Sequence, residues 1–319
     1  MSGVLVLDRA QTRAALDPER LMAAVAQALI AIARGQVSAP PRIAALAPAG
    51  LLGAMPAHVP GLGLAAKLVS VFADPEQPGR SAHRGVVALF DEHDGRLLAL
   101  MDAESVTACR TAATATHSMR ALARSRPARI AVIGSGAQAE AQVALLAALQ
   151  KAGLQDATPV VVGARDLGRA RQTAALHPNA TADTIAAAVE GADVVLCCTG
   201  ARTPVLSRSQ LAHGAHLSSV GGSSGPEIDA DTVKDGSLFV EWDGAFSCPP
   251  PAGAHELQIP AAQRAALLGE VLDGRHPGRR HPGELTVFKS TGHAALDVAA
   301  ASVVHAYARA HGLGTLLDL

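Results

Sequence analysis

Hydrophobic residues recur at two different spacings along the chain, and the change of spacing divides it into two parts. In the first part, apolar side chains follow helical spacing within residues 18–34. Strand-like runs follow at residues 65–72, 85–91 and 97–102. The last two runs are separated by the turn dipeptide Asp94-Gly95, which predicts an antiparallel sheet. The segment after this sheet, residues 104–124, predicts a helix with Ala-rich faces.

After Pro127, short apolar runs alternate with helical stretches. The predicted strands are residues 129–134, 159–163, 192–199 and 215–221. The predicted helices are residues 136–152, 166–176 and 181–190. This alternation predicts βαβ units with a parallel sheet. We therefore expect an α/β fold with a Rossmann-type dinucleotide-binding domain at residues 126–290.

The two ends of the chain are expected to form a second domain. Residues 291–311 predict an amphipathic, Ala-rich helix, which we expect to return and pack on the first part of the chain. Residues 1–125 and 291–319 are therefore assigned to one α+β domain.

Composition excludes several classes of protein. With 49% hydrophobic residues among 319, the chain has ample material for a core, which excludes disorder as its main state. A net charge of −1 leaves no basic excess for nucleic-acid phosphates. The longest apolar stretch, residues 21–33, is interrupted by Gln27 and is too short to cross a membrane. Since the N-terminus also has no signal-peptide pattern, we expect a cytoplasmic protein without nucleic-acid or membrane partners.

The cysteines and histidines show no metal-binding pattern. The four cysteines have no metal-ligand spacing, and Cys197 and Cys198 lie in an apolar run, which indicates reduced thiols. The 13 histidines include no HExxH motif, and we expect most of them to lie at the surface, with His216, His281 and His293 among those outside any cluster. We expect no metal site.

A glycine-rich turn follows the first strand of the second part. Gly134 permits a tight turn, Gly136 lets the backbone approach a pyrophosphate, and Ala139 allows close packing of the next helix on the strand. The helix start at Ala137 and Gln138 supplies free N–H groups and a positive dipole end. Because the motif lies between a predicted strand and a predicted helix, it favours dinucleotide binding over an ordinary glycine-rich turn.

The end of the second strand of this part bears on which dinucleotide binds. A carboxylate that holds the ribose 2′-hydroxyl is expected there, but the sequence has Gly163-Ala164-Arg165. Arg165, with help from Arg169, is placed to pair with a 2′-phosphate. We therefore expect NADP(H) to be preferred, with NAD(H) possible if Arg165 is only a solvated residue at a helix start.

Three basic residues of the first part stand among apolar or small residues: Arg42, Lys67 and Arg110. Cations in such surroundings are costly to bury without an anion. Taken alone, Lys67 is best interpreted as a surface lysine. The three cations, together with a dinucleotide domain, predict a site for an anionic substrate. Asp297, on the predicted last helix, is expected to form a structural salt bridge to the region of Arg110.

Motifs along nearly the whole chain resemble the ornithine cyclodeaminase/mu-crystallin family. In the first part the similar segments are Pro40-Pro41-Arg42, Met55-Pro56-Ala57, Lys67-Leu68-Val69-Ser70-Val71-Phe72, Leu89-Phe90-Asp91, Leu100-Met101-Asp102 and Arg110-Thr111-Ala112-Ala113. In the second part they are Gly134-Ser135-Gly136-Ala137-Gln138-Ala139, Ala215-His216, Val220-Gly221 and Phe288-Lys289-Ser290-Thr291-Gly292.

The resemblance implies a Rossmann domain and a substrate and dimerisation domain built from both chain ends, in a protein that is usually a homodimer. It implies that the substrate carboxylate is bound by Arg42, Lys67 and Arg110. It implies further that Ser290 and Thr291 lie near the nicotinamide end of the cofactor, beside the substrate. The cofactor lining implied by the resemblance is Ala137, Gln138, Thr199, Val220 and Gly221.

One position departs from the cyclodeaminases of this family, in which an aspartate after Val-Gly-Gly is the acid/base. Here Val220-Gly221-Gly222 is followed by Ser223, which does not titrate near neutral pH and is a poor general base. Glu227 or Asp229 would replace the aspartate only if the loop were remodelled. Reduction of a preformed cyclic imine needs less proton shuttling than cyclodeamination. Lys67 is then the candidate for proton transfer, and Ser223 for orienting the ring nitrogen or a water.

We therefore expect an NAD(P)H-dependent reductase that acts on a small-molecule imino or amino acid. Its expected reaction converts Δ1-pyrroline-2-carboxylate or Δ1-piperideine-2-carboxylate to L-proline or L-pipecolate. Three alternatives stay open: an ornithine cyclodeaminase, an oxidoreductase similar to alanine dehydrogenase, and a non-catalytic NADP(H)-binding protein similar to mu-crystallin.

Overall fold

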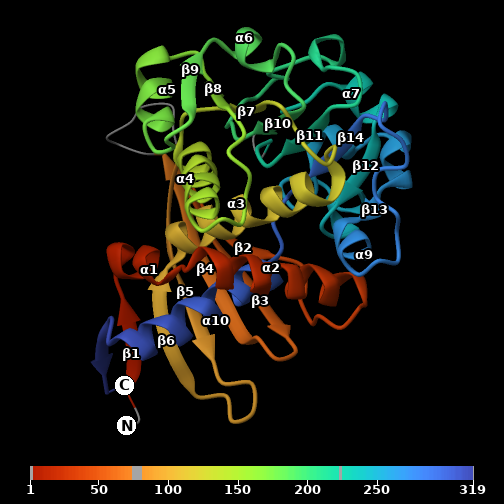
Figure 1. The fold of residues 1–319 in the computed structure, drawn as a ribbon. Helices are drawn as coiled ribbons and strands as arrows, with labels where there is room; N and C mark the ends of the chain where they lie inside the picture. The colour runs from red at the N-terminus through yellow and green to blue at the C-terminus, as the bar shows by residue number, and fades with distance from the viewer. Residues whose placement is uncertain (1–2, 74–80, 223–224, 319) are drawn as a thin grey trace. The chain divides into compact units, whose positions relative to one another are not determined.

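The computed structural model describes residues 3–73, 81–222 and 225–318 (Figure 1). The chain forms two compact units. Unit 1 comprises residues 1–110 and 293–319, and unit 2 comprises residues 111–292.

Unit 1 is built on a seven-stranded sheet of mixed direction. Its strands are β1 (Val4–Leu7), β2 (Ile43–Ala47), β3 (Gly50–Val59), β4 (Gly63–Ala73), β5 (Ser81–Phe90), β6 (Leu97–Asp102) and β15 (Thr315–Leu317). They lie in the order β15-β1-β6-β5-β4-β3-β2. The helices of this unit are α1 (Arg9–Ala15), α2 (Pro18–Ala33) and α10 (Ala294–His311). Helix α3 (Ala103–Leu122) begins in unit 1 and continues into unit 2.

One face of this sheet is covered by the last helix of the chain. Helix α10 packs against β3, β4 and β5 and against α2, so both chain ends contribute to one core (Figure 1). Successive side chains of a strand point to opposite faces. In β4, Ala65 and Lys67 are buried, whereas Leu64 and Leu68 are exposed. The strand period therefore brings the lysine to the face that α10 covers.

Unit 2 contains an eight-stranded sheet in which every pair of neighbouring strands is parallel. Its strands are β7 (Ile130–Ile133), β8 (Val160–Gly163), β9 (Ala180–Asp183), β10 (Val194–Cys197), β11 (His216–Ser219), β12 (Ser237–Val240), β13 (Ala266–Leu267) and β14 (Thr286–Lys289). Its helices are α4 (Ala137–Lys151), α5 (Leu167–Ala174), α6 (Ile185–Val189), α7 (Ala230–Asp235), α8 (Gly244–Ser247) and α9 (Leu268–Leu272). Short 3-10 helices are η1 (Arg208–Gln210), η2 (His255–Leu257) and η3 (Pro260–Arg264).

The strand order of unit 2 is that of a dinucleotide-binding fold. The order β13-β12-β14-β11-β10-β7-β8-β9 means that the chain runs outward from β7 to β9 and then returns to the other side of β7. A crevice at such a reversal is where open α/β sheets bind their ligands. The strands β7, β8, β10 and β11 are completely buried, as expected for a parallel sheet covered on both faces. The predicted α/β fold with a Rossmann-type domain is confirmed.

The sequence patterns missed several elements. Residues 181–190 are not one helix, because Ala180–Asp183 forms the edge strand β9 before α6 begins. The Pro- and Gly-rich stretch between α2 and β4 contains the strands β2 and β3. None of the helices in the described part of the chain has the length and apolar character needed to cross a membrane.

Candidate functional site

The buried charges of unit 1 gather where β4 and α3 meet α10. The carboxylate of Asp297 forms ion pairs with Nζ of Lys67 at 2.8 Å and with Nε of Arg110 at 3.1 Å. Lys67 Nζ also lies 3.4 Å from the hydroxyl of Thr107. Lys67 is only 5% exposed, so it is not the surface lysine that it suggested when taken alone. The expected salt bridge between Asp297 and Arg110 is confirmed, and it includes Lys67.

This cluster carries more positive than negative charge, and its surroundings lower the pKa of Lys67. Burial lowers the pKa of Lys67 to about 8; the nearby charges of Arg110 and Arg42 lower it too, whereas Asp297 opposes the shift. Burial alone would raise the pKa of Asp297, but the adjacent Lys67 and Arg110 outweigh it and hold the carboxyl below its ordinary value. At neutral pH the cluster of Lys67, Arg110 and Asp297 therefore has a net charge of about +1.

His293 lies beside this cluster and was missed by the sequence analysis, which expected most histidines at the surface. It is buried at the start of α10, where its Nδ1 accepts from the backbone N–H of Ala295 at 3.2 Å. Burial lowers its pKa to about 4 against the attraction of Asp297, with Arg110 and Arg42 adding to the decrease. The imidazole is therefore neutral at pH 7, with Nε2 as its protonated nitrogen.

His216 is another exception to the expectation that most histidines lie at the surface, because it is completely buried in β11. Its ring nitrogens lie 3.0 Å from the hydroxyl of Thr286 and 3.2 Å from that of Ser118. Burial, with the charge of Arg279, lowers the pKa of His216 to about 3. It is a neutral structural residue in the core of unit 2.

The glycine-rich turn of unit 2 has the shape that a pyrophosphate requires. Gly134 has φ of +123°, and a Cβ there would lie 2.6 Å from the carbonyl oxygen of Cys198, so only glycine fits. A Cβ at Gly136 would meet nothing within 4 Å, which leaves room for a ligand. Gly136 caps α4 without a side-chain hydrogen bond, so the first N–H groups of the helix are available to an anion. The residues present therefore fit a dinucleotide.

Two further residues at this turn match that use. Ala139 is buried against the strand, and the buried Oε1 of Gln138 accepts no hydrogen bond from the described residues.

Arg169, on α5, donates to the carbonyl oxygen of Ser135 at 3.1 Å, which ties α5 to the turn. Arg165 is exposed just beyond the end of β8. Both arginines thus lie in the segment that follows β8.

The other predicted cofactor residues follow the carboxyl ends of neighbouring strands. Thr199 follows β10, Val220 and Gly221 follow β11, and Ser290 and Thr291 follow β14. The N–H of Ser290 donates to the carbonyl oxygen of Ser219 at 2.9 Å. The hydroxyl of Thr291 accepts from the indole N–H of Trp242 at 3.0 Å. A small cavity opens between these loops, lined by Val220, Gly221, Ser290 and Thr291 among others.

A second group of buried charges lies under the loops of unit 2. Lys289, at the end of β14, contacts a carboxylate oxygen of Glu256 at 3.0 Å. Its Nζ also donates to the hydroxyl of Ser219 at 2.9 Å and to the carbonyl oxygen of Gly221 at 2.7 Å. Ser219 in turn donates to Glu227 at 2.6 Å. In the sequence, Lys289 stands out only as part of a family motif; its position at a strand end, as one of four lysines in the chain, was the available signal.

The residues proposed for acid/base chemistry near Val220 are placed differently. Ser223 lies outside the described residues. Glu227 is completely buried and accepts hydrogen bonds from the loop backbone and hydroxyls. Asp229 caps α7, accepting from the N–H of Thr232 at 3.0 Å and from that of Arg208 at 3.1 Å. Both acids are already engaged within unit 2.

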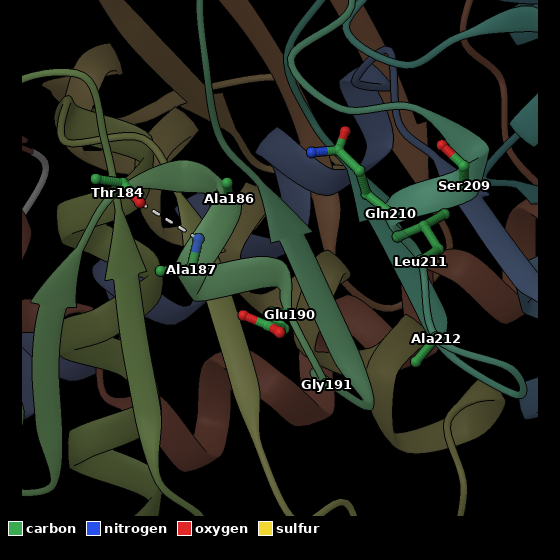
Figure 2. A pocket seen from close by; sticks show the side chains of 9 residues that line it. All are labelled: Thr184, Ala186, Ala187, Glu190, Gly191, Ser209, Gln210, Leu211 and Ala212. Atoms are coloured by element: carbon green, nitrogen blue, oxygen red, sulfur yellow. Dashed lines mark hydrogen bonds between the residues drawn. The ribbon is translucent and has the colours of Figure 1, made fainter.

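A separate cavity of about 670 Å³ lies between α6 and the turn after η1 (Figure 2). The hydroxyl of Thr184, which lines it, accepts from the N–H of Ala187 at 3.3 Å and so caps α6. Glu190 and Leu211 of its lining precede β10 and β11, so the cavity extends toward the amino ends of these strands. The glycine-rich turn lies at the opposite, carboxyl edge. No group of three or more His, Cys, Asp or Glu side chains in the described ranges is arranged to hold a metal ion.

Comparison with known proteins places the chain in a family. The model of the ornithine cyclodeaminase/mu-crystallin family matches residues 4–312. The chain belongs to this family. A Δ1-pyrroline-2-carboxylate reductase from Burkholderia ambifaria is 33% identical over 315 residues, which is 94% of each chain.

Solved structures of the family share the whole fold. The Δ1-pyrroline-2-carboxylate reductase of Thermococcus litoralis, in complex with NADH and L-proline, has a TM-score of 0.85 at 25% identity over 98% of this chain and all of the other. An archaeal alanine dehydrogenase dimer with bound NAD has a TM-score of 0.85 at 27% identity over 99% of both chains.

Proposed function

We propose that the protein is an NAD(P)H-dependent reductase of a cyclic imino acid, with Δ1-pyrroline-2-carboxylate or Δ1-piperideine-2-carboxylate as substrate. The observation that carries this proposal is the buried, net-positive cluster of Lys67, Arg110 and Asp297. The relatives support it, because a family member 33% identical to this chain is a Δ1-pyrroline-2-carboxylate reductase. The products are L-proline or L-pipecolate.

The charge of the cluster determines what it can bind. Asp297 neutralises one of the two cations that contact it, and Arg42 adds a further positive charge nearby. A second carboxylate, from the substrate, neutralises the positive charge that Asp297 leaves on Lys67 and Arg110. Fixing that carboxylate orients the adjacent imine carbon, which removes much of the entropic cost of reaction.

Lys67 has a second role in this proposal. Because its pKa is about 8, it is mostly protonated at neutral pH yet gives up a proton more readily than an exposed lysine. Lys67 can therefore bind the substrate carboxylate as a cation and donate a proton to the ring nitrogen when the imine is reduced. The sequence position of Ser223 suits a hydroxyl that orients this nitrogen or a water.

Unit 2 is proposed to hold the dinucleotide, which when bound supplies the hydride. The turn from Gly134 to Gly136 and the first N–H groups of α4 would receive the pyrophosphate. Arg165 and Arg169 would pair with a 2′-phosphate, so we propose a preference for NADP(H). Replacing Arg165 with Ala should raise the KM for NADPH about tenfold and leave that for NADH nearly unchanged. Equal effects on the two cofactors would reject the preference.

The face of the unit 1 sheet that α10 leaves uncovered is proposed to bind a second copy of the chain. In the register, Ile43, Ala54, Leu68 and Val86 lie in one row across β2 to β5. Ile43 is 68% exposed, and Leu68 and Val86 are each 40% exposed. Apolar patches of this kind mark interfaces, and the structurally similar alanine dehydrogenase is a dimer. Replacing Leu68 with Arg should give a monomer in sedimentation; a wild-type protein that sediments as a monomer would reject the interface.

The four cysteines are free thiols, which supports our assignment of the protein to the reducing cytoplasm.

Oxidation of NADPH and NADH at 340 nm with Δ1-pyrroline-2-carboxylate tests the proposed reaction. Parallel assays measure ammonia release from ornithine with NAD⁺, and NADH oxidation with pyruvate and ammonia. We expect turnover of the cyclic imine and none of ornithine. Turnover of ornithine alone would identify a cyclodeaminase, and turnover of pyruvate with ammonia alone an alanine dehydrogenase. Cofactor binding without any turnover would favour the binding-protein alternative.

A further inference from the structure

Glu227 has every oxygen of its carboxylate occupied by donors from two loops. One oxygen accepts from the N–H of Thr199 at 2.6 Å and from its hydroxyl at 2.7 Å. The other accepts from the hydroxyl of Ser219 at 2.6 Å and from the N–H of Gly221 at 2.8 Å. The residue is completely buried. Four donors on one carboxylate satisfy it, and no cation of the described residues forms an ion pair with it.

These four bonds join the ends of two adjacent parallel strands. Thr199 follows β10, whereas Ser219 ends β11 and Gly221 follows it. Both loops lie at the carboxyl edge of the sheet, where dinucleotides bind in this fold. The clamp therefore fixes the backbone of the loops that are proposed to line the cofactor.

The backbone at Gly221 and Gly222 packs closely on the charged groups of this cluster. A Cβ at Gly221 would lie 2.5 Å from an oxygen of Glu227 and 2.0 Å from the carbonyl oxygen of Thr199. At Gly222 a Cβ would lie 2.9 Å from Nζ of Lys289. The side chains of Glu227 and Lys289 therefore lie close against the backbone of this loop. They hold the loop in one conformation, because a shift of the backbone would break several of their hydrogen bonds at once.

Lys289 supports the clamp from the neighbouring strand β14. Its ammonium donates a hydrogen bond to the hydroxyl of Ser219, and that hydroxyl donates one to Glu227. The three groups therefore form one chain of hydrogen bonds that ends at the carboxylate. Glu256 contacts the same ammonium, and it also accepts from the N–H of Glu227 at 3.3 Å. The orientation of Glu227 is thus determined by three strands of the sheet.

We propose that Glu227 is a positioning residue that holds the loops at Thr199 and Gly221 in the conformation that binds the dinucleotide. This inference rests on the proposed dinucleotide site in unit 2. It assigns no proton transfer to Glu227, since all of its acceptor sites are engaged away from solvent.

The decisive variant is Glu227→Gln, which keeps the shape but replaces one acceptor oxygen with an NH₂ group. That group would face two donors, either those of Thr199 or those of Ser219 and Gly221. We expect the Kd for NADPH, measured by quenching of its fluorescence, to rise about tenfold or more, because bonds to a charged acceptor are among the stronger ones. Glu190→Gln, at an exposed position of the same unit, is the matched control and should leave the Kd unchanged.

Thr199→Val and Ser219→Ala each remove one hydroxyl donor and keep the backbone N–H groups. Each should raise the Kd about threefold, and in combination with Glu227→Gln they should add little, because the clamp is already lost. These two variants decide the question if Glu227→Gln does not fold. Binding of NADPH within twofold of wild type in the folded variants would overturn the proposal.

The outcomes separate this inference from the proposed reaction. If Glu227 were an acid/base, Glu227→Gln would lower kcat and alter its pH profile at an unchanged Kd for NADPH, and that result would also overturn the proposal. If no cyclic imine is turned over by the wild-type protein but the Kd rises as expected, the proposed reaction fails and the positioning role stands.

Discussion

The two units each bury a cluster of three charged residues, and the two clusters have opposite compositions. In unit 1, two cations, Lys67 and Arg110, share the carboxylate of Asp297. In unit 2, the carboxylates of Glu227 and Glu256 accompany one ammonium, that of Lys289. The first cluster has a net positive charge, whereas in the second the carboxylate of Glu227 is satisfied by backbone and hydroxyl donors. A net positive cluster suits the binding of an anion, and a carboxylate held by two loops suits the support of those loops.

The largest effect is expected from removing the shared carboxylate of unit 1. Asp297→Asn removes the carboxylate that two buried cations share, which should cost about 3–5 kcal/mol of unfolding free energy at pH 7. Asp297 raises the pKa of Lys67, so without it that pKa falls below about 8. The unfolded chain then binds more protons than the native state, and stability should recover as pH rises toward 9. Urea titrations between pH 6 and 9 measure this slope.

The matching change in unit 2 removes the cation of the second cluster. Lys289→Met leaves Glu256 buried without its cation, at a cost of about 3 kcal/mol near neutral pH. Urea titration of the variant and the wild type at pH 7 measures this loss. A loss below about 1 kcal/mol would show that Lys289 is not the counter-charge that Glu256 needs.

Sequence patterns predicted the order of elements well because the strands of unit 2 are uniformly apolar and the helices between them are periodic. They also identified Lys67, Arg110 and Asp297, since charges inside apolar runs need partners. The patterns failed at β2 and β3, where proline and glycine hide strand pairs that form only against β4.

The cluster around Glu227 was beyond prediction for a similar reason. Ser219, Glu227, Glu256 and Lys289 come from four separate segments, and only the order of strands in the sheet brings them together. His216 and His293 likewise carry no sequence signal of burial. Local spacing does not reveal contacts that depend on strand order.

A smaller effect tests how unit 2 tolerates protonation outside its charged cluster. The pKa of His216 is about 3 in the folded protein, against an ordinary value of 6.5. Below about pH 6.5 the unfolded chain therefore binds a proton at this histidine that the native state does not bind. Stability should fall by about 2 kcal/mol between pH 7 and pH 5 from this residue. His216→Asn should flatten that part of the stability curve, and an unchanged slope would assign it to other groups.

The central claim is that the cation cluster of unit 1 binds the carboxylate of the substrate. The most direct test compares kcat/KM for Δ1-pyrroline-2-carboxylate and for Δ1-pyrroline, which lacks the carboxylate, in the wild-type protein and in Arg110→Met. Each ratio is taken within one protein, so losses of stability cancel. We expect the wild type to prefer the acid by about a hundredfold or more and the variant to lose most of that preference. An equal preference in both proteins would show that the carboxylate binds elsewhere and would contradict the account.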